Sequence, residues 1–295
     1  MSVYGKDGTA LLSVFSVDGV DLAKAYSKSG TVIFDKTDYS SYTKTNYCTV
    51  TTNQMQGFDI FGDYIFQFRA NSSTVNNIMK TINAKTNTVI QDDIHSASDH
   101  GDSASFSTEY YDSNDQFPLL YVTADTNPAK VYVNRVTLTS SQLVRTLLFP
   151  IDKAGYYSAA ALDAENNIIY MVGYSEQNYQ TDGGGSNKTV ISKWDLSYLT
   201  ENQDGSFTPV FVSRIERPFI YVMQGQQCHD GMLWIASGGT NYNGYIYALD
   251  AQSGNLLYTI DTETTVEVEG LSFISEREMV VGFQRNGYVK YTFGA

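Results

Sequence analysis

The sequence predicts an all-β protein, a β-propeller of five blades that carries a small β-repeat extension at its N-terminus. Three observations lead to this fold class. The chain is rich in aromatic and poor in charged residues, its first residues repeat every eleven positions, and a longer strand pattern recurs through the remainder. Many short strands separated by turns are typical of propellers, and a β-sandwich is the alternative that stays open.

The composition supports strands and turns and limits the partners. Of the 295 residues, 14% are aromatic and 17% charged, with 23 glycines but only 5 prolines. Aromatic residues favour strands and glycines favour turns. The excess of 32 Asp+Glu over 19 Lys+Arg gives a net charge of −13. Because nucleic-acid surfaces are basic, we expect no nucleic-acid partner.

Neither a membrane segment nor a secretion signal is expected. No apolar run approaches the roughly 18 to 20 residues that a spanning helix needs. Residues 1–8 lack the basic start and apolar run of a signal peptide. Cys48 and Cys228 form no metal-binding spacing, and we expect them to be free thiols.

The N-terminal repeat predicts β-hairpins. Aromatic residues recur at Tyr4, Phe15 and Tyr26, and each is followed by a glycine that comes after Asp or Ser. This order suits tight hairpin turns. Residues 1–34 would then form an attachment module, since units this small bury little apolar surface alone. An extension without a partner is the alternative. The polar residues 35–46 are expected to be a linker.

The strand pattern of residues 47–295 predicts propeller blades. Each unit begins with a strand of small residues, followed by a turn and a strongly apolar strand. Met55-Gln56-Gly57 and Met223-Gln224-Gly225 stand at the same offset from their second strands. Small residues suit the crowded centre, where inner strands converge. The last unit has only three strands, and residues 47–52 are expected to add the fourth and close the ring.

The residues that start the inner strands are expected to line the central funnel and bind a ligand. They are Gln56, His100, Tyr157, Gln224 and Glu269. Amide and phenol groups exchange hydrogen bonds with sugar hydroxyls, and aromatic faces stack on sugar rings. The alternative is that the glutamines only satisfy backbone groups at the crowded centre.

Acidic residues near the same positions suggest two further kinds of site. Asp99, His100 and Asp102 lie close enough in sequence to hold a metal, although their spacing matches no zinc motif. A hydrogen-bonded loop that connects two blades explains them better, so we expect no cofactor and keep Ca²⁺ as an alternative. If the protein is an enzyme, the acid and base carboxylates of a glycosidase would come from Glu269, Asp102 and Asp59.

The eleven-residue N-terminal repeat, the MQG-type inner strands and the segment 103–123 together resemble tail or receptor-binding proteins encoded by gut phages and prophages. The resemblance covers most of the chain and implies a virion or host-surface adhesin. It implies that residues 1–34 bind other tail proteins and that the propeller recognises a host cell-surface glycan or glycoprotein. The protein would then lie in the virion or at an extracellular surface.

Three functional hypotheses follow. The first is a non-enzymatic, adhesin-like binding protein. The alternatives are a glycoside hydrolase or lyase on the same five-bladed scaffold, and a purely structural virion component. For the first two, the negative net charge favours neutral over acidic glycans as ligands.

Overall fold

The computed structural model describes residues 37–51, 54–69, 77–98, 100–124, 126–178, 181–239 and 242–294, together with short strands at 3–4, 10–11, 24–26 and 32–35. The chain forms two compact units, one of Met1–Thr43 with Thr292–Ala295 and one of Lys44–Tyr291. Within the described residues, none of the helices is long and apolar enough to cross a membrane. The expected division at residues 34 and 46 stays a prediction.

The N-terminal unit contains a small antiparallel sheet in the order β2-β1-β3-β4. Its strands are β1 (Val3–Tyr4), β2 (Ala10–Leu11), β3 (Lys24–Tyr26) and β4 (Val32–Asp35). β1 pairs with β2 inside the first eleven-residue repeat, and β3 pairs with β4 inside the third. The second repeat lies outside the described residues. Two of the three repeats therefore form the strand pairs that their turn residues predict.

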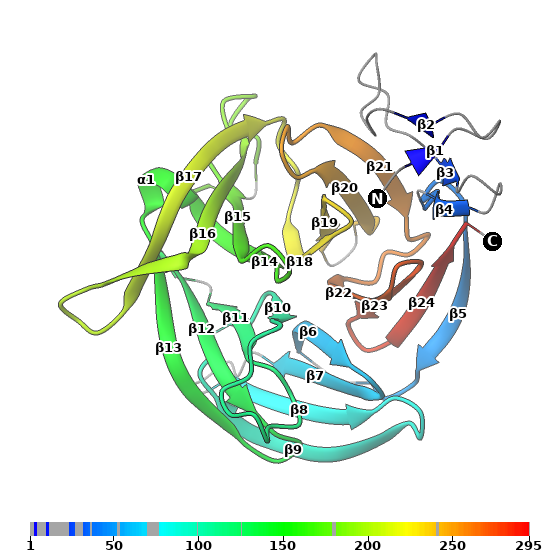
Figure 1. Ribbon diagram of the computed structural model, residues 1–295, viewed down its shortest axis with the longest axis horizontal. Coiled ribbons are helices and arrows are strands. Elements are labelled where there is room, and N and C mark those ends of the chain that lie inside the picture. Colours follow the sequence, from blue (N-terminus) through cyan, green and yellow to red (C-terminus); the bar gives the residue numbers. More distant parts are fainter. Residues whose placement is uncertain are drawn as a thin grey trace. The chain divides into compact units, whose positions relative to one another are not determined.

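The larger unit is a five-bladed β-propeller, which confirms the predicted fold class. In each blade the strands are antiparallel neighbours from the centre outward (Figure 1). Blade one has β6 (Met55–Phe61), β7 (Tyr64–Arg69), β8 (Asn77–Asn83) and β9 (Thr88–Ser96). Blade two has β10 (Ala104–Phe106), β11 (Leu120–Ala124), β12 (Ala129–Val136) and β13 (Ser141–Phe149). Blade three has β14 (Tyr156–Asp163), β15 (Ile168–Tyr174), β16 (Thr189–Glu201) and β17 (Phe207–Arg217). Blade four has β18 (Met223–His229), β19 (Met232–Ser237), β20 (Tyr245–Asp250) and β21 (Leu256–Asp261).

Blade five joins the two ends of the propeller chain. It contains β22 (Val268–Ser275), β23 (Glu278–Phe283) and β24 (Gly287–Phe293), and its outer strand is β5 (Tyr42–Cys48). The closing strand thus comes from the N-terminal side, as predicted, but it starts before residues 47–52. Its first four residues alternate between half-buried and exposed and only Cys48 is buried, a weak pattern in a polar segment. In the described chain the only helix is the single turn α1 (Ile151–Ala154).

The hydrophobic core lies in the seams between neighbouring blades. One cluster joins blades two and three around Trp194 and Phe149, whose ring centroids are 5.2 Å apart. Another joins blades one and two around Phe66 and Phe117, at 4.9 Å. The aromatic excess of the sequence is therefore used largely in these seams. Cys48 is buried, Cys228 is half-buried, and both are free thiols as predicted.

Blades two and three share more than side-chain packing. Their outer strands β13 and β17 pair in parallel, with Leu147 opposite Phe207. The two blades thereby form one eight-stranded sheet, whereas the other blades are separate four-stranded sheets in the described chain.

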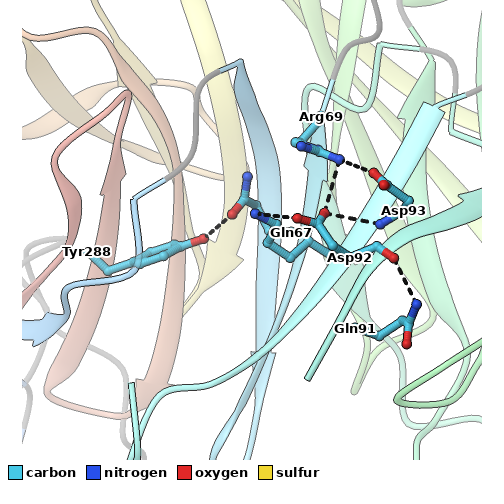
Figure 2. Close-up of polar contacts among 7 residues, drawn as sticks. Gln67, Arg69, Gln91, Asp92, Asp93 and Tyr288 are labelled. Carbon is cyan, nitrogen blue, oxygen red and sulfur yellow. Dashed lines mark hydrogen bonds and ion pairs between the residues drawn. The ribbon is translucent and has the colours of Figure 1, made fainter. Parts of the chain in front are cut away.

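Buried polar contacts lie at the seam between blades five and one and, separately, within blade one (Figure 2). Tyr288 of β24 donates its hydroxyl to Gln67 Oε1 at 2.8 Å, and both residues are buried. Burial raises the pKa of Tyr288 well above its usual value. Further out on blade one, the buried Lys80 Nζ lies 3.0 Å from Asp92 Oδ2, and Arg69 contacts the same carboxylate at 3.0 Å. Buried polar groups need such partners, so the Tyr288–Gln67 hydrogen bond favours one specific pairing of the two blades, and the contacts of Asp92 join β7, β8 and β9 within blade one.

Candidate functional site

The five inner strands β6, β10, β14, β18 and β22 surround the propeller axis (Figure 1). Glycines near their starts let the backbones approach closely. Gly57 N donates to Gly101 O at 2.7 Å. A Cβ built on Gly225 would lie 2.5 Å from Gly270 Cα and 3.4 Å from Asp102 O. The residues beside these glycines, Gln224, Glu269 and Asp102 among them, therefore meet at one end of the axis.

We define the axial site as the polar residues grouped at this end: His100, Asp102, Gln224, Glu267, Glu269 and Gln284. His100 and Asp102 precede β10, Gln224 is in β18, and Glu269 is in β22. Gln56 occupies the equivalent position of β6 and is 9% exposed. Tyr157 lies in β14, where its backbone N donates to Asn127 Oδ1 at 3.0 Å. That these residues bind a ligand stays a prediction.

Glu269 is the most deeply buried carboxyl group of the axial site. The residue is only 1% exposed, and its Oε1 accepts a 2.8 Å hydrogen bond from Gln284 Nε2. Burial raises the pKa of the Glu269 carboxyl well above its usual value, and the nearby Glu267 and Asp102 raise this pKa further. The Gln284 hydrogen bond and His100 act in the opposite direction on that pKa. Glu269 therefore keeps its proton to a higher pH than an ordinary glutamic acid.

The side-chain amides of Gln224 and Gln284 donate hydrogen bonds to the two carboxyl groups at the start of blade five, Glu267 and Glu269. Gln224 Nε2 donates to Glu267 Oε1 at 3.0 Å and to Gly238 O at 3.4 Å. The backbone of Gln284 donates to Glu267 O at 3.0 Å, which places Gln284 across from the start of β22. Sequence reasoning missed Glu267 and Gln284. The alternation Glu267-Val268-Glu269 was a usable signal, because side chains two apart share one face of a strand.

His100 and Asp102 form the more exposed part of the axial site. His100 Nδ1 lies 2.5 Å from Asp102 Oδ1, with side-chain exposures of 43% and 20%. A carboxylate at this distance orients the imidazole ring. Asp99, the third predicted metal ligand, lies outside the described residues. Within the part of the chain that the structure describes, no three His, Cys, Asp or Glu residues gather as a metal site would require.

Asp59, the third candidate catalytic carboxylate, is placed differently. It lies further along β6, is 5% exposed, and binds groups from several blades. Its Oδ1 accepts from Ile60 N at 2.9 Å, Gln227 Nε2 at 2.9 Å and Ser272 Oγ at 2.6 Å. Its Oδ2 accepts from Phe106 N at 2.7 Å. These contacts join blades one, two, four and five, so the structure places Asp59 as a link between inner strands.

Asp59 should make folding stability depend on pH. Burial raises the pKa of Asp59 to about 6 in spite of its four hydrogen-bond donors. The unfolded state ionises first, near its ordinary pKa of about 3.9, so rising pH favours unfolding until the native carboxyl also ionises. We expect this residue to lower the unfolding free energy by about 3 kcal/mol between pH 4 and 6. Urea denaturation of wild type and Asp59→Asn across this range measures the difference, and parallel curves would contradict the expectation.

Strained backbone accompanies the axial end. Gln54, which precedes β6, has a φ of 62°, Tyr157 has 48°, and Val222, which precedes β18, has 38°. A positive φ is unusual for residues with large side chains, and most unfavourable for the β-branched valine. Such strain is concentrated at functional sites, which agrees with the position of the axial site.

Comparison with known proteins identifies the fold and no family. Neither a family model nor a curated protein matches this chain. Among solved structures, the glutaminyl cyclase of Myxococcus xanthus matches with a TM-score of 0.50 at 10% identity, covering 85% of this chain and 94% of that one. A luciferin-regenerating enzyme matches with a TM-score of 0.46 at 9% identity, covering 85% and 95%.

These matches correct the resemblance to phage tail or receptor-binding proteins, which was wrong. The solved structure that matches at a TM-score of 0.50 is a glutaminyl cyclase and not a phage protein, so the non-enzymatic adhesin hypothesis, which depended on the resemblance, is withdrawn with it. The physical reason lies in the motif. Gly57 and Gly225 are needed because inner strands touch backbone to backbone, a requirement of the crowded propeller centre rather than of one family.

Proposed function

We propose that the protein is a glycoside hydrolase that cleaves neutral glycans by acid–base catalysis at the axial site. One observation carries the proposal: the buried Glu269 carboxyl holds its proton to unusually high pH while the carboxylates Glu267 and Asp102 lie near it. Glycosidases need two carboxyl groups in different protonation states, one to donate a proton and one to activate water. Environments that separate the pKa values of neighbouring carboxyls produce this difference.

Glu269 is the proton donor in this proposal. Its proton passes to the glycosidic oxygen as the bond between that oxygen and the anomeric carbon breaks. Because Glu269 is 1% exposed, the substrate must displace the Gln284 amide from Glu269 Oε1 to reach it. The burial of the carboxyl keeps it protonated until the substrate arrives.

Asp102 activates the water. Its carboxylate accepts one proton as the water oxygen forms its bond to the anomeric carbon, so that the proton lost by Glu269 is balanced by one gained at Asp102. His100, 2.5 Å from Asp102 Oδ1, orients the carboxylate. At 20% side-chain exposure, Asp102 can meet both water and substrate.

The substrate should be an uncharged glycan. The carboxylates Glu267 and Asp102 of the axial site and a net charge of −13 repel anionic sugars. The amides of Gln224 and Gln284 can both donate to and accept from sugar hydroxyls. Lyase chemistry is disfavoured because β-elimination acts on uronic acid units, which carry the wrong charge for this site.

The experiment is a substrate screen with the wild-type protein. We expect release of reducing ends from at least one neutral polysaccharide among arabinan, xylan, mannan, glucan and galactan, and none from polygalacturonate. A peptide with an N-terminal glutamine is included because the structural neighbour is a glutaminyl cyclase. Cyclisation of that peptide with no glycan turnover would replace the hydrolase proposal, and inactivity on every neutral glycan would overturn it.

A further inference from the structure

We propose that a row of aromatic rings beside the axial site binds successive sugar units of an extended neutral glycan. The inference rests on the proposed function and names its substrate more closely: an oligosaccharide or polysaccharide chain, not a monosaccharide derivative. The aromatic row consists of Phe219, Tyr221 and Tyr242, whose rings are accessible, and of the buried Tyr174, which supports the inner end of the row.

The rings of the aromatic row follow one another at contact distance. The centroids of Tyr174 and Phe219 are 5.5 Å apart, those of Phe219 and Tyr221 are 6.4 Å apart, and those of Tyr221 and Tyr242 are 5.2 Å apart. Exposure increases in the same direction. Tyr174 is 2% exposed, the middle two are half-buried, and Tyr242 is 54% exposed. The row therefore leads from the interior of the protein to solvent.

The aromatic row lies at the same end of the propeller as the axial site. Met223, the first residue of β18, pairs with Ser237, the last residue of β19, so the connections before β18 and after β19 share that end. Phe219 and Tyr221 precede β18, and Tyr242 follows β19. The connection is direct, because Gln224 of the axial site donates to Gly238 O at 3.4 Å.

Local contacts fix the aromatic row in place before any ligand binds. Tyr174 accepts a 2.8 Å hydrogen bond at its hydroxyl from Met223 N. Ser237 Oγ donates to Tyr221 O at 2.5 Å, and Gly238 N donates to Val222 O at 3.1 Å. Val222 keeps its strained φ of 38° between these contacts. A strained backbone held by several hydrogen bonds pre-organises the rings that flank it.

The chemistry of the aromatic row suits neutral sugars. Aromatic faces pack against the C–H face of a pyranose or furanose ring, while the phenol hydroxyls of Tyr221 and Tyr242 can hydrogen-bond to sugar hydroxyls. Glu267, which Gln224 binds at 3.0 Å, adds negative charge beside the row and disfavours anionic units. A chain held on these rings would extend outward from the bond placed at Glu269.

Binding as a function of chain length tests the inference. The probes are linear neutral gluco-, manno-, xylo- and arabino-oligosaccharides from disaccharide to hexasaccharide, titrated by calorimetry into Glu269→Gln protein. We expect affinity to rise with length, and Tyr242→Ala in that background to weaken hexasaccharide binding about five- to tenfold while disaccharide binding is unchanged. Tyr242→Phe keeps the ring and should restore most of the affinity.

The control and the outcomes separate this inference from the proposed function. Tyr198→Ala removes an equally large ring, 72% exposed on β16, and should leave binding unchanged. Length-dependent binding that needs Tyr242, without turnover by wild type, would keep the aromatic row and overturn the hydrolase. Turnover without dependence on length or Tyr242 would overturn the aromatic row alone. Failure of every oligosaccharide to bind would overturn it as well.

Discussion

Glu269→Gln should lower kcat at least about 100-fold, and up to about 10,000-fold, on the glycan found by the substrate screen. The substitution removes the proton that the leaving group needs and preserves the shape of the side chain. The carbonyl oxygen of the new amide can still accept from Gln284 Nε2, which bonds to Glu269 at 2.8 Å in the native protein. KM should therefore change little. A kcat within a few-fold of wild type would contradict the assignment of Glu269 as the acid.

The pH profile of the same reaction gives a second measure of Glu269. An acid catalyst must be protonated, so activity is lost as pH rises through its pKa. Glu267 raises the pKa of Glu269, and Glu267→Gln should therefore move the alkaline limb of kcat/KM to lower pH. Glu276→Gln is the matched control, an exposed glutamate in the turn between β22 and β23. An alkaline limb that stays in place in Glu267→Gln would show that Glu269 does not set it.

Gly225→Ala should destabilise the protein by about 3 kcal/mol, at the upper end of the usual cost of overpacking. The added Cβ would lie 2.5 Å from Gly270 Cα and 2.9 Å from Glu269 O. Both are backbone atoms of a neighbouring inner strand, so no side chain can turn aside to relieve the clash. The inner strands would have to separate, which also displaces Glu269. Urea denaturation measures the loss in unfolding free energy.

Gly239→Ala is the control for this substitution. Its Cβ would meet Val222 Cγ1 at 3.8 Å and Tyr242 Cδ2 at 3.9 Å, which is ordinary contact. We expect its stability to stay within about 0.5 kcal/mol of wild type. Equal stability of the two variants would mean that the centre of the propeller tolerates widening.

The fold was predictable because its crowded centre constrains the sequence. Gly57 and Gly225 recur in the same motif since the inner strands permit no Cβ there, and this repetition marks the start of a blade. The closing strand β5 was harder to place. Its pattern is polar, and its pairing partner β24 lies at the other end of the chain, where local sequence carries no information about it.

The axial site was predictable in position and less so in chemistry. The pattern of the inner strands predicts Gln224 and Glu269, because both lie near the start of such a strand. It does not predict Gln284, which follows β23 and reaches the site only because β23 pairs with β22. The state of a carboxyl depends on burial and neighbours that sequence does not reveal. Asp59 and Glu269 look alike in the sequence, yet one joins four blades through its hydrogen bonds and the other lies among carboxylates.

The parallel pairing of β13 with β17 makes the ring mechanically uneven. Blades two and three are joined by a strand pair at their outer edges, whereas the other described blades form separate sheets. If neighbouring blades move apart and together, blades two and three would therefore move as one body, and the motion would occur at the seams between the other blades. Asp102 precedes the first strand of that body, while Gln224 and Glu269 belong to blades outside it. The spacing between Asp102 and Glu269 then spans seams at which such motion would occur, and the stiffness of those seams would influence the geometry of the reaction.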